Sequence, residues 1–191
     1  MIRSALLAGL TAALLSTAAA AAPADDFLAA LKPLCGKAFA GRIVTEEAPN
    51  SAFAGKPLVM HVRECDAQGV RIPFHVGDDR SRTWVVTRTG QGLRLKHDHR
   101  HEDGSEDKMT QYGGDTAAPG TAIRQEFPAD AHSKTIFQRD GLNAAVDNVW
   151  AMEVQPGKLF AYELRRPGRF FRAEFDLTRP VEPPPAPWGA K

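Results

Sequence analysis

Apolar and polar residues alternate along most of the chain, which is the pattern of β-strands that bury one face. In the segment 159–165, Phe160, Tyr162 and Leu164 share a face, and the other face includes the charged Glu163 and Arg165. Turns rich in glycine, proline or aspartate separate such segments. Strands are predicted over residues 37–44, 58–64, 70–76, 82–89, 93–101, 108–113, 122–127, 148–154, 159–165 and 169–177.

Two segments have helical character instead. Asp25 precedes a short run of alanine and leucine, so we expect it to cap a helix that ends before Gly36. The strand rhythm also breaks between residues 128 and 147, where Asp130 can cap a helical insert near 130–141.

The pattern predicts an all-β fold, a single antiparallel β-barrel of about 9–10 strands with a short N-terminal helix and a helical insert. Closure into a barrel removes exposed strand edges, and a two-sheet sandwich is the alternative. We expect one domain over residues 23–178, followed by an extended proline-rich tail over 179–191.

The order of elements resembles the calycin barrels, the lipocalins and fatty-acid-binding proteins. The run 36–39 (Gly-Lys-Ala-Phe) is similar to the Gly-x-Trp start of the first lipocalin strand, with Phe39 in place of tryptophan. The insert between 128 and 147 departs from both families, and the last strand has Arg172-Ala173-Glu174 where fatty-acid-binding proteins have Arg-x-Tyr. Strand parity points Arg172 outward, so the resemblance implies a fold and no carboxylate-binding role.

The first 22 residues have the order of a secretory signal peptide. Arg3 forms the basic region, 5–15 the apolar region, and the alanines at 18–22 the cleavage site. The apolar stretch is short and has no basic stop behind it, so we expect no stable membrane span after cleavage. The predicted location is periplasmic or secreted.

Cys35 and Cys65 are the only cysteines. Two cysteines in an exported chain favour a disulfide, and the absence of a CxxC motif disfavours a redox or metal pair. Closing a loop of about 30 residues stabilises the fold by roughly 3–4 kcal/mol on the chain-entropy model.

Composition and charge argue against a disordered chain and against a nucleic-acid-binding protein. With 43% hydrophobic residues the chain can bury a core. Without the signal peptide, which holds one basic residue, the charges balance at 24 − 1 = 23 basic against 23 acidic residues. No charge block indicates a nucleic-acid partner.

Three of the six histidines lie in one predicted strand. Parity places Leu93, Leu95, His97, His99 and His101 on one face, so an apolar face changes into a row of imidazoles.

Three interpretations of this row remain open. The imidazoles can form structural hydrogen bonds within the barrel mouth, contact a small ligand, or bind metal. Zinc could use His97, His99 and His101, with a carboxylate from Asp103 or Glu106. No second motif at ligand spacing accompanies them, and no cofactor is required by any other motif.

These residues therefore support two hypotheses about function, from different classes. The first is binding of a small lipophilic molecule by a monomer, with Trp150 and Tyr162 in an apolar pocket and with His97, His99 and Gln125 orienting the ligand. The second is a metal-dependent enzyme that uses the histidine strand. A side-chain-filled barrel acting through its surface is a third possibility. The residues expected to line or fill the interior are Leu93, Leu95, Ile123, Phe127, Trp150, Met152, Phe160, Tyr162, Phe171 and Phe175.

Overall fold

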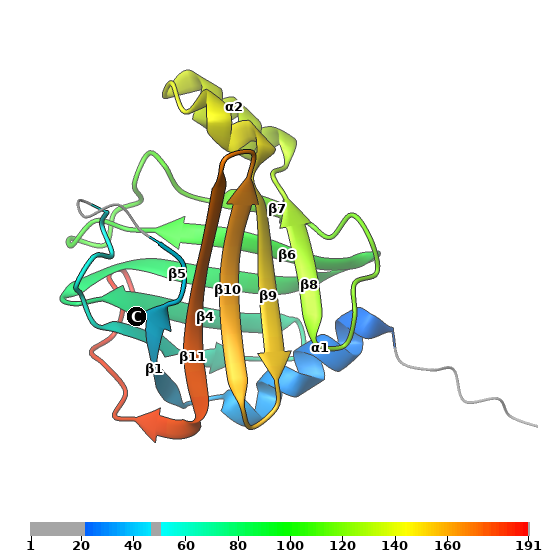
Figure 1. Cartoon of the computed structure of the whole chain (residues 1–191), viewed down its shortest axis with the longest axis vertical. Helices are drawn as coiled ribbons and strands as arrows, with labels where there is room; N and C mark the ends of the chain where they lie inside the picture. Colours follow the sequence, from blue (N-terminus) through cyan, green and yellow to red (C-terminus); the bar gives the residue numbers. More distant parts are fainter. Residues whose placement is uncertain (1–21, 47–50, 191) are drawn as a thin grey trace, which may run out of the picture.

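The computed structural model describes residues 22–46 and 51–190, so the predicted cleavage region lies almost wholly outside the described residues. One antiparallel sheet curls into a nearly closed barrel, with α2 over one end and α1 across the other (Figure 1). This confirms the predicted all-β barrel with an N-terminal helix and a helical insert. The strands are β1 (Ala38–Ile43), β2 (Leu58–His61), β3 (Glu64–Cys65), β4 (Gly69–Val76), β5 (Asp79–Thr89), β6 (Gly92–His99), β7 (Tyr112–Asp115), β8 (Arg124–Pro128), β9 (Val149–Gln155), β10 (Leu159–Arg166) and β11 (Arg169–Val181). The helices are α1 (Pro23–Leu31), η1 (Lys32–Leu34), α2 (Ala131–Arg139) and η2 (Asn143–Asp147).

The sheet order is β7-β6-β5-β4-β2-β1-β11-β10-β9-β8, and β3 pairs with β4 beyond β2. Ala38 of β1 pairs with Val181 of β11, which brings distant parts of the chain together. Pro73 lies between the β4 segment paired with β2 and the segment paired with β3. A proline, which has no backbone N–H, fits this break in the ladder.

The strand that returns after the histidines differs from the prediction. The alternation predicted it over 108–113, whereas β7 spans Tyr112–Asp115 and so begins later and continues through Gly114. A Cβ on Gly113 would collide with the Leu95 carbonyl oxygen, and one on Gly114 would collide with that of Pro128. The glycines therefore permit a close backbone approach that no larger residue could make.

These glycines form the seam where β7 meets β8. The Gly113 N–H donates to the Ser133 hydroxyl (2.7 Å), and the Asp130 N–H donates to the Gly113 carbonyl (2.9 Å). Lys96 of β6 forms a salt bridge with the Asp130 carboxylate at 2.5 Å. The start of α2 thus links the two end strands of the sheet.

Each helix covers one end of the barrel. Phe27 and Leu31 of α1 are fully buried. The expected Asp25 cap is wrong, because α1 begins earlier, at Pro23, and Asp25 forms an ion pair with Arg88 from within the first turn. Asp130 caps α2 as predicted, accepting from the Ser133 N–H at 2.8 Å.

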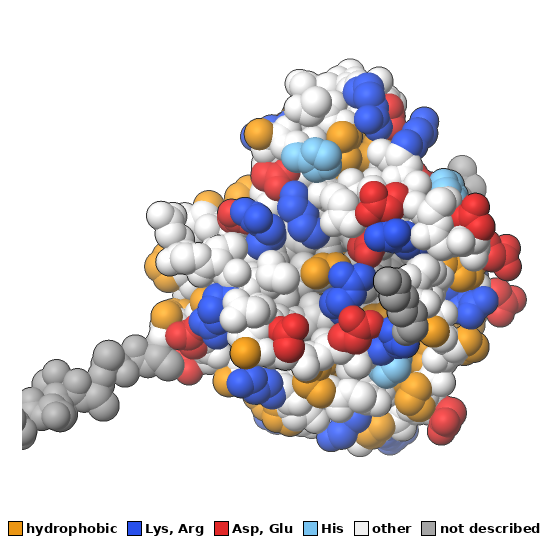
Figure 2. All heavy atoms as spheres, turned by 180° about the vertical axis from the view of Figure 1, so that it is seen from behind, with side chains coloured by type: hydrophobic (Ala, Val, Ile, Leu, Met, Phe, Trp, Pro, Cys, Tyr) orange, Lys and Arg blue, Asp and Glu red, His pale blue; other side chains and the backbone are white. Residues whose placement is uncertain are grey.

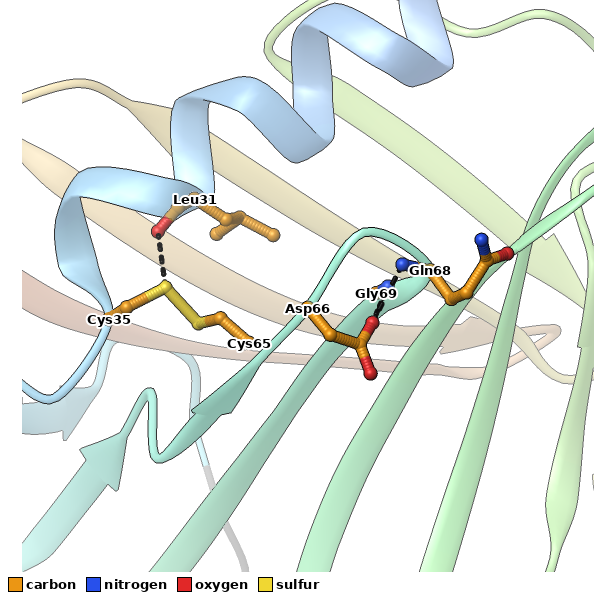
Figure 3. Close-up of a disulfide and its surroundings, with 6 residues drawn as sticks. All are labelled: Leu31, Cys35, Cys65, Asp66, Gln68 and Gly69. Carbon is orange, nitrogen blue, oxygen red and sulfur yellow. Dashed lines mark hydrogen bonds between the residues drawn. A yellow bond between two sulfur atoms is a disulfide. The ribbon is translucent and has the colours of Figure 1, made fainter.

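The predicted disulfide is present. Cys35, just after η1, is bonded to Cys65 at the end of β3, with a Cα–Cα distance of 6.2 Å (Figure 3). The Cys35 sulfur also lies 4.0 Å from the Leu31 carbonyl oxygen at the end of α1. The bridge therefore fixes the N-terminal helix to the barrel wall.

Side chains fill the middle of the barrel. Trp150, Met152, Phe171 and Phe175 are all buried, as strand parity predicts. Ile123 was expected inside, but it precedes β8 in a turn and is 47% exposed. The fully buried interior residues include Leu93, Leu95, Phe127, Met152, Phe160 and Phe175.

The outer face carries acidic and basic side chains side by side, and Figure 2 shows this mixture on the side turned away in Figure 1. β11 extends to Val181, so the predicted tail boundary at 179 falls inside a strand. Farther on, the backbone N–H of Trp188 donates to the Arg80 carbonyl at 3.1 Å. The tail thus packs on the barrel near Asp98, which is buried.

Candidate functional site

A pocket of about 460 Å³ opens at the α2 end of the barrel. It lies between the helical insert, the ends of β9 to β11, and the segment that precedes β2. Its described lining residues are Phe53, Met109, Tyr112, Phe137, Gly141, Leu142, Asn143, Ala144, Ala145, Asn148, Trp150, Tyr162, Leu164, Arg166, Arg169 and Phe171. The size and the apolar lining are typical of a small-molecule site.

Aromatic rings from separate elements form the walls. The Tyr112 ring of β7 lies 5.5 Å from Phe137 of α2 and 5.7 Å from Trp150 of β9. On the opposite side, Phe53 packs against Phe171 with their centroids 5.2 Å apart. Gly141 ends the insert in the left-handed conformation (φ 73°), which turns the chain toward η2 over the pocket.

His97 lies behind the pocket wall and is not part of the lining. Its Nδ1 lies 3.1 Å from the Tyr112 carbonyl oxygen, and its Nε2 lies 2.7 Å from the Tyr162 hydroxyl. Because a carbonyl only accepts, Nδ1 carries the proton and donates. In the neutral ring Nε2 is then the acceptor, and the Tyr162 hydroxyl donates to it.

His99 lies two residues farther along β6, on the same face and closer to solvent, and forms a similar hydrogen bond. Its Nε2 lies 3.1 Å from the Tyr112 hydroxyl. Each of these two histidines is thus bonded to a tyrosine that lines the pocket. The first of the open interpretations, structural hydrogen bonding, describes what the geometry shows.

Burial controls the protonation of the whole group. It lowers the pKa of His97 to about 3, with the neighbouring His99 adding to the shift. It also lowers the pKa of His99 to about 4, with help from Arg82. Burial raises the pKa of Tyr112 to about 12 and holds that of Tyr162 well above its usual value.

At neutral pH the imidazoles are therefore uncharged and the phenols protonated. A general acid or base works best with a pKa near the working pH, and all four groups are shifted away from it. The network can orient the two tyrosine rings and can offer hydrogen bonds. It is not tuned to move protons.

The metal hypothesis lacks a ligand cluster in the part of the chain that the structure describes. There, no group of three or more His, Cys, Asp or Glu side chains is placed to hold an ion. β6 ends at His99, so His101 lies beyond the strand, exposed, with its Nε2 3.9 Å from an Asp107 carboxylate oxygen. The predicted row of three imidazoles is therefore broken after the second.

The predicted ligand residues separate into three groups. Trp150 and Tyr162 line the pocket, and His97 and His99 support it through the tyrosines. Gln125 is fully buried, but its amide donates to the Thr121 carbonyl at 2.8 Å and it does not line the pocket.

Sequence reasoning missed four notable lining residues. Phe53 and Phe137 lie outside the predicted strands, and Asn148 begins one of them. Arg166 continues the parity of Tyr162 and Leu164 by one step beyond the predicted strand, so extending that strand would have found it.

Comparison with known proteins adds no relative. No protein-family model, no curated protein and no solved structure matches the chain. Across residues 22–46 and 51–190, no helix has the length and apolarity needed to cross a bilayer. The pocket itself is therefore the basis for assigning a function.

Proposed function

We propose that the chain is an exported, monomeric, calycin-like β-barrel protein that binds a small lipophilic molecule in the pocket at the α2 end. The observation that carries this is the aromatic-walled pocket of about 460 Å³. Burying the apolar surface of a ligand against Phe53, Trp150 and Phe171 would supply the main free energy of binding, at about 25 cal/mol per Å² before the costs of association.

The support network favours a binding site. A rigid wall lowers the entropy that binding must overcome. His97 stacks on Tyr112 with ring centroids 4.4 Å apart, and Trp84 stacks on Tyr162 at the same distance. Both pocket tyrosines are therefore held from behind before any ligand arrives.

Two observations support export. The Cys35–Cys65 bridge is typical of an oxidising compartment, and the first 22 residues have the order of a signal peptide. Intact-mass measurement of the native protein should give the chain without these residues. A full-length mass in the cytosol would contradict export and leave the binding proposal to its own test.

The binding test uses an uncharged fluorescent lipophile, N-phenyl-naphthylamine. We expect saturable one-to-one binding to the wild-type protein. Ala144 is an exposed pocket residue in η2, so Ala144→Trp should fill the pocket without disturbing the core and should reduce affinity at least about tenfold.

Ala131→Trp is the matched control, because Ala131 is exposed at the start of α2 and does not line the pocket. It should bind the probe like wild type. Absence of saturable binding, or equal binding by both tryptophan variants, would refute the proposal. A native mass spectrum of protein purified from its own source would identify a retained ligand.

A further inference from the structure

Two arginines face each other at the rim of the pocket. Arg166, the last residue of β10, is the cross-strand partner of Arg169, the first residue of β11. Both line the pocket together with Leu164 and Phe171. The tight turn through Pro167 and Gly168 therefore brings two guanidinium groups to one edge of an aromatic site.

Arg166 differs from the arginines of the outer face in its partner. Its guanidinium donates to the neutral Asn148 Oδ1 at 3.1 Å, and within the described ranges it forms no salt bridge with a carboxylate. The next residue back, Arg165, points outward and donates twice to the Glu126 carboxylate at 2.7 Å each. The charge of Arg166 is thus directed to the pocket and lacks an acidic partner there.

The charged residues in the described part of the lining are basic. Its described members include two arginines and no aspartate or glutamate. Asn148 is buried, and its side-chain oxygen holds the Arg166 guanidinium in place. An anionic group placed here would meet preorganised N–H donors at one end of an apolar site.

We propose that the pocket selects lipophilic anions, with a carboxylate or similar oxyanion at Arg166 on the rim and the apolar body between Phe53, Trp150 and Phe171. This rests on the proposed function and adds the charge of the ligand to it. An arginine fork matches the two oxygens of a carboxylate, whereas a neutral alcohol of equal length gains only a single, uncharged hydrogen bond.

The test compares ligands that differ only in charge. The affinities of anilinonaphthalene sulfonate and of uncharged N-phenyl-naphthylamine are measured first. Laurate and dodecanol then compete with the bound probe for the pocket. We expect laurate to displace the probe about tenfold better than dodecanol in the wild-type protein, since a hydrogen bond to a charged group is worth at least that factor. High salt should lower the affinity for anilinonaphthalene sulfonate and leave the affinity for the neutral probe unchanged.

Arg166→Gln should remove most of the preference for laurate while leaving the affinity for N-phenyl-naphthylamine within about twofold. Arg166→Lys keeps the charge without the fork and should retain part of the preference. Arg42→Gln is the matched control, because it removes the same charge from a side chain that is 80% exposed on the outer face. It should leave every affinity unchanged.

The outcomes distinguish a failure of this inference from a failure of the proposed binding function. Equal binding of charged and neutral ligands by the wild-type protein would overturn the inference and leave the binding function intact. A preference that survives in folded Arg166→Gln would overturn the assignment to this rim. If no probe binds, or if Ala144→Trp does not reduce binding, both proposals fail. If Arg166→Gln does not fold, the salt dependence of the wild-type protein and the Arg166→Lys affinities still decide the result.

Discussion

Replacing Tyr162 by phenylalanine removes one buried oxygen atom from the wall of the pocket. That hydroxyl donates to His97 Nε2 at 2.7 Å, and both residues are buried. In the variant, the Nε2 lone pair loses its only donor among the described groups and remains shielded from water. A buried acceptor left without a partner costs about 1–3 kcal/mol, so we expect a loss of about 2 kcal/mol in the free energy of unfolding.

Tyr112→Phe is the control. It deletes the hydroxyl bonded to His99 Nε2 at 3.1 Å, but His99 is only half-buried, and water can replace the lost partner. The expected cost is therefore nearer about 0.5–1 kcal/mol. Urea denaturation followed by intrinsic fluorescence measures both values, provided that the m-values of the variants agree.

A double-mutant cycle isolates the interaction. In a His97→Leu background no acceptor is left, so Tyr162→Phe should become nearly neutral, and the coupling free energy should exceed about 1 kcal/mol. A cost below about 0.5 kcal/mol for Tyr162→Phe in the wild-type background, or a coupling near zero, would show that this hydrogen bond does not support the pocket.

Three further predictions concern stability. Phe175→Ala should lose about 3–5 kcal/mol in urea denaturation, and a loss under about 1 kcal/mol would contradict its core position. Because the pKa of folded His97 is lowered to about 3 from 6.5, its contribution is complete above pH 6.5 and is lost as the pH falls toward 3, by about 1.4 kcal/mol per unit. His97→Gln should flatten that slope, and an unchanged acid titration would refute it. Gly114→Ala should cost about 1–3 kcal/mol through collision with the Pro128 carbonyl, whereas Gly90→Ala, with open space around it, should not; equal melting temperatures would disprove the close approach.

Within the strands, parity was sufficient to predict that four large apolar side chains face the interior. Trp150, Met152, Phe171 and Phe175 are inside because a two-residue repeat leaves each strand only one apolar face. The disulfide partners and both helices were predicted from other signals, namely the presence of only two cysteines and the interruptions of the strand alternation. Parity does not predict pairing partners, and so the predicted strand ended at Gly113, although the lack of a Cβ at Gly113 and Gly114 permits the close approach of neighbouring strands.

The site was less predictable because tertiary packing creates it. Trp150 and Tyr162 were found through their face, but Phe137 reaches the pocket only because α2 folds over that end of the barrel. Gln125 has the expected inward face, yet its amide is used by the carbonyl of Thr121 in a neighbouring loop. Periodicity contains no information about such backbone acceptors.

The pairing of β1 with β11 also sets the order in which this chain can fold. Ala38 and Val181 are 181 − 38 = 143 residues apart, so their contact carries a large loop-closure entropy and a high sequence separation. The hairpins β5–β6 and β10–β11 need only local contacts and can form much earlier. Until the 13 residues of β11 pair with β1, the chain is an open sheet, and the free edges of β1 and β11 can recruit strands from other molecules. The last strand therefore governs the rate of barrel closure and protects the folding chain from aggregation.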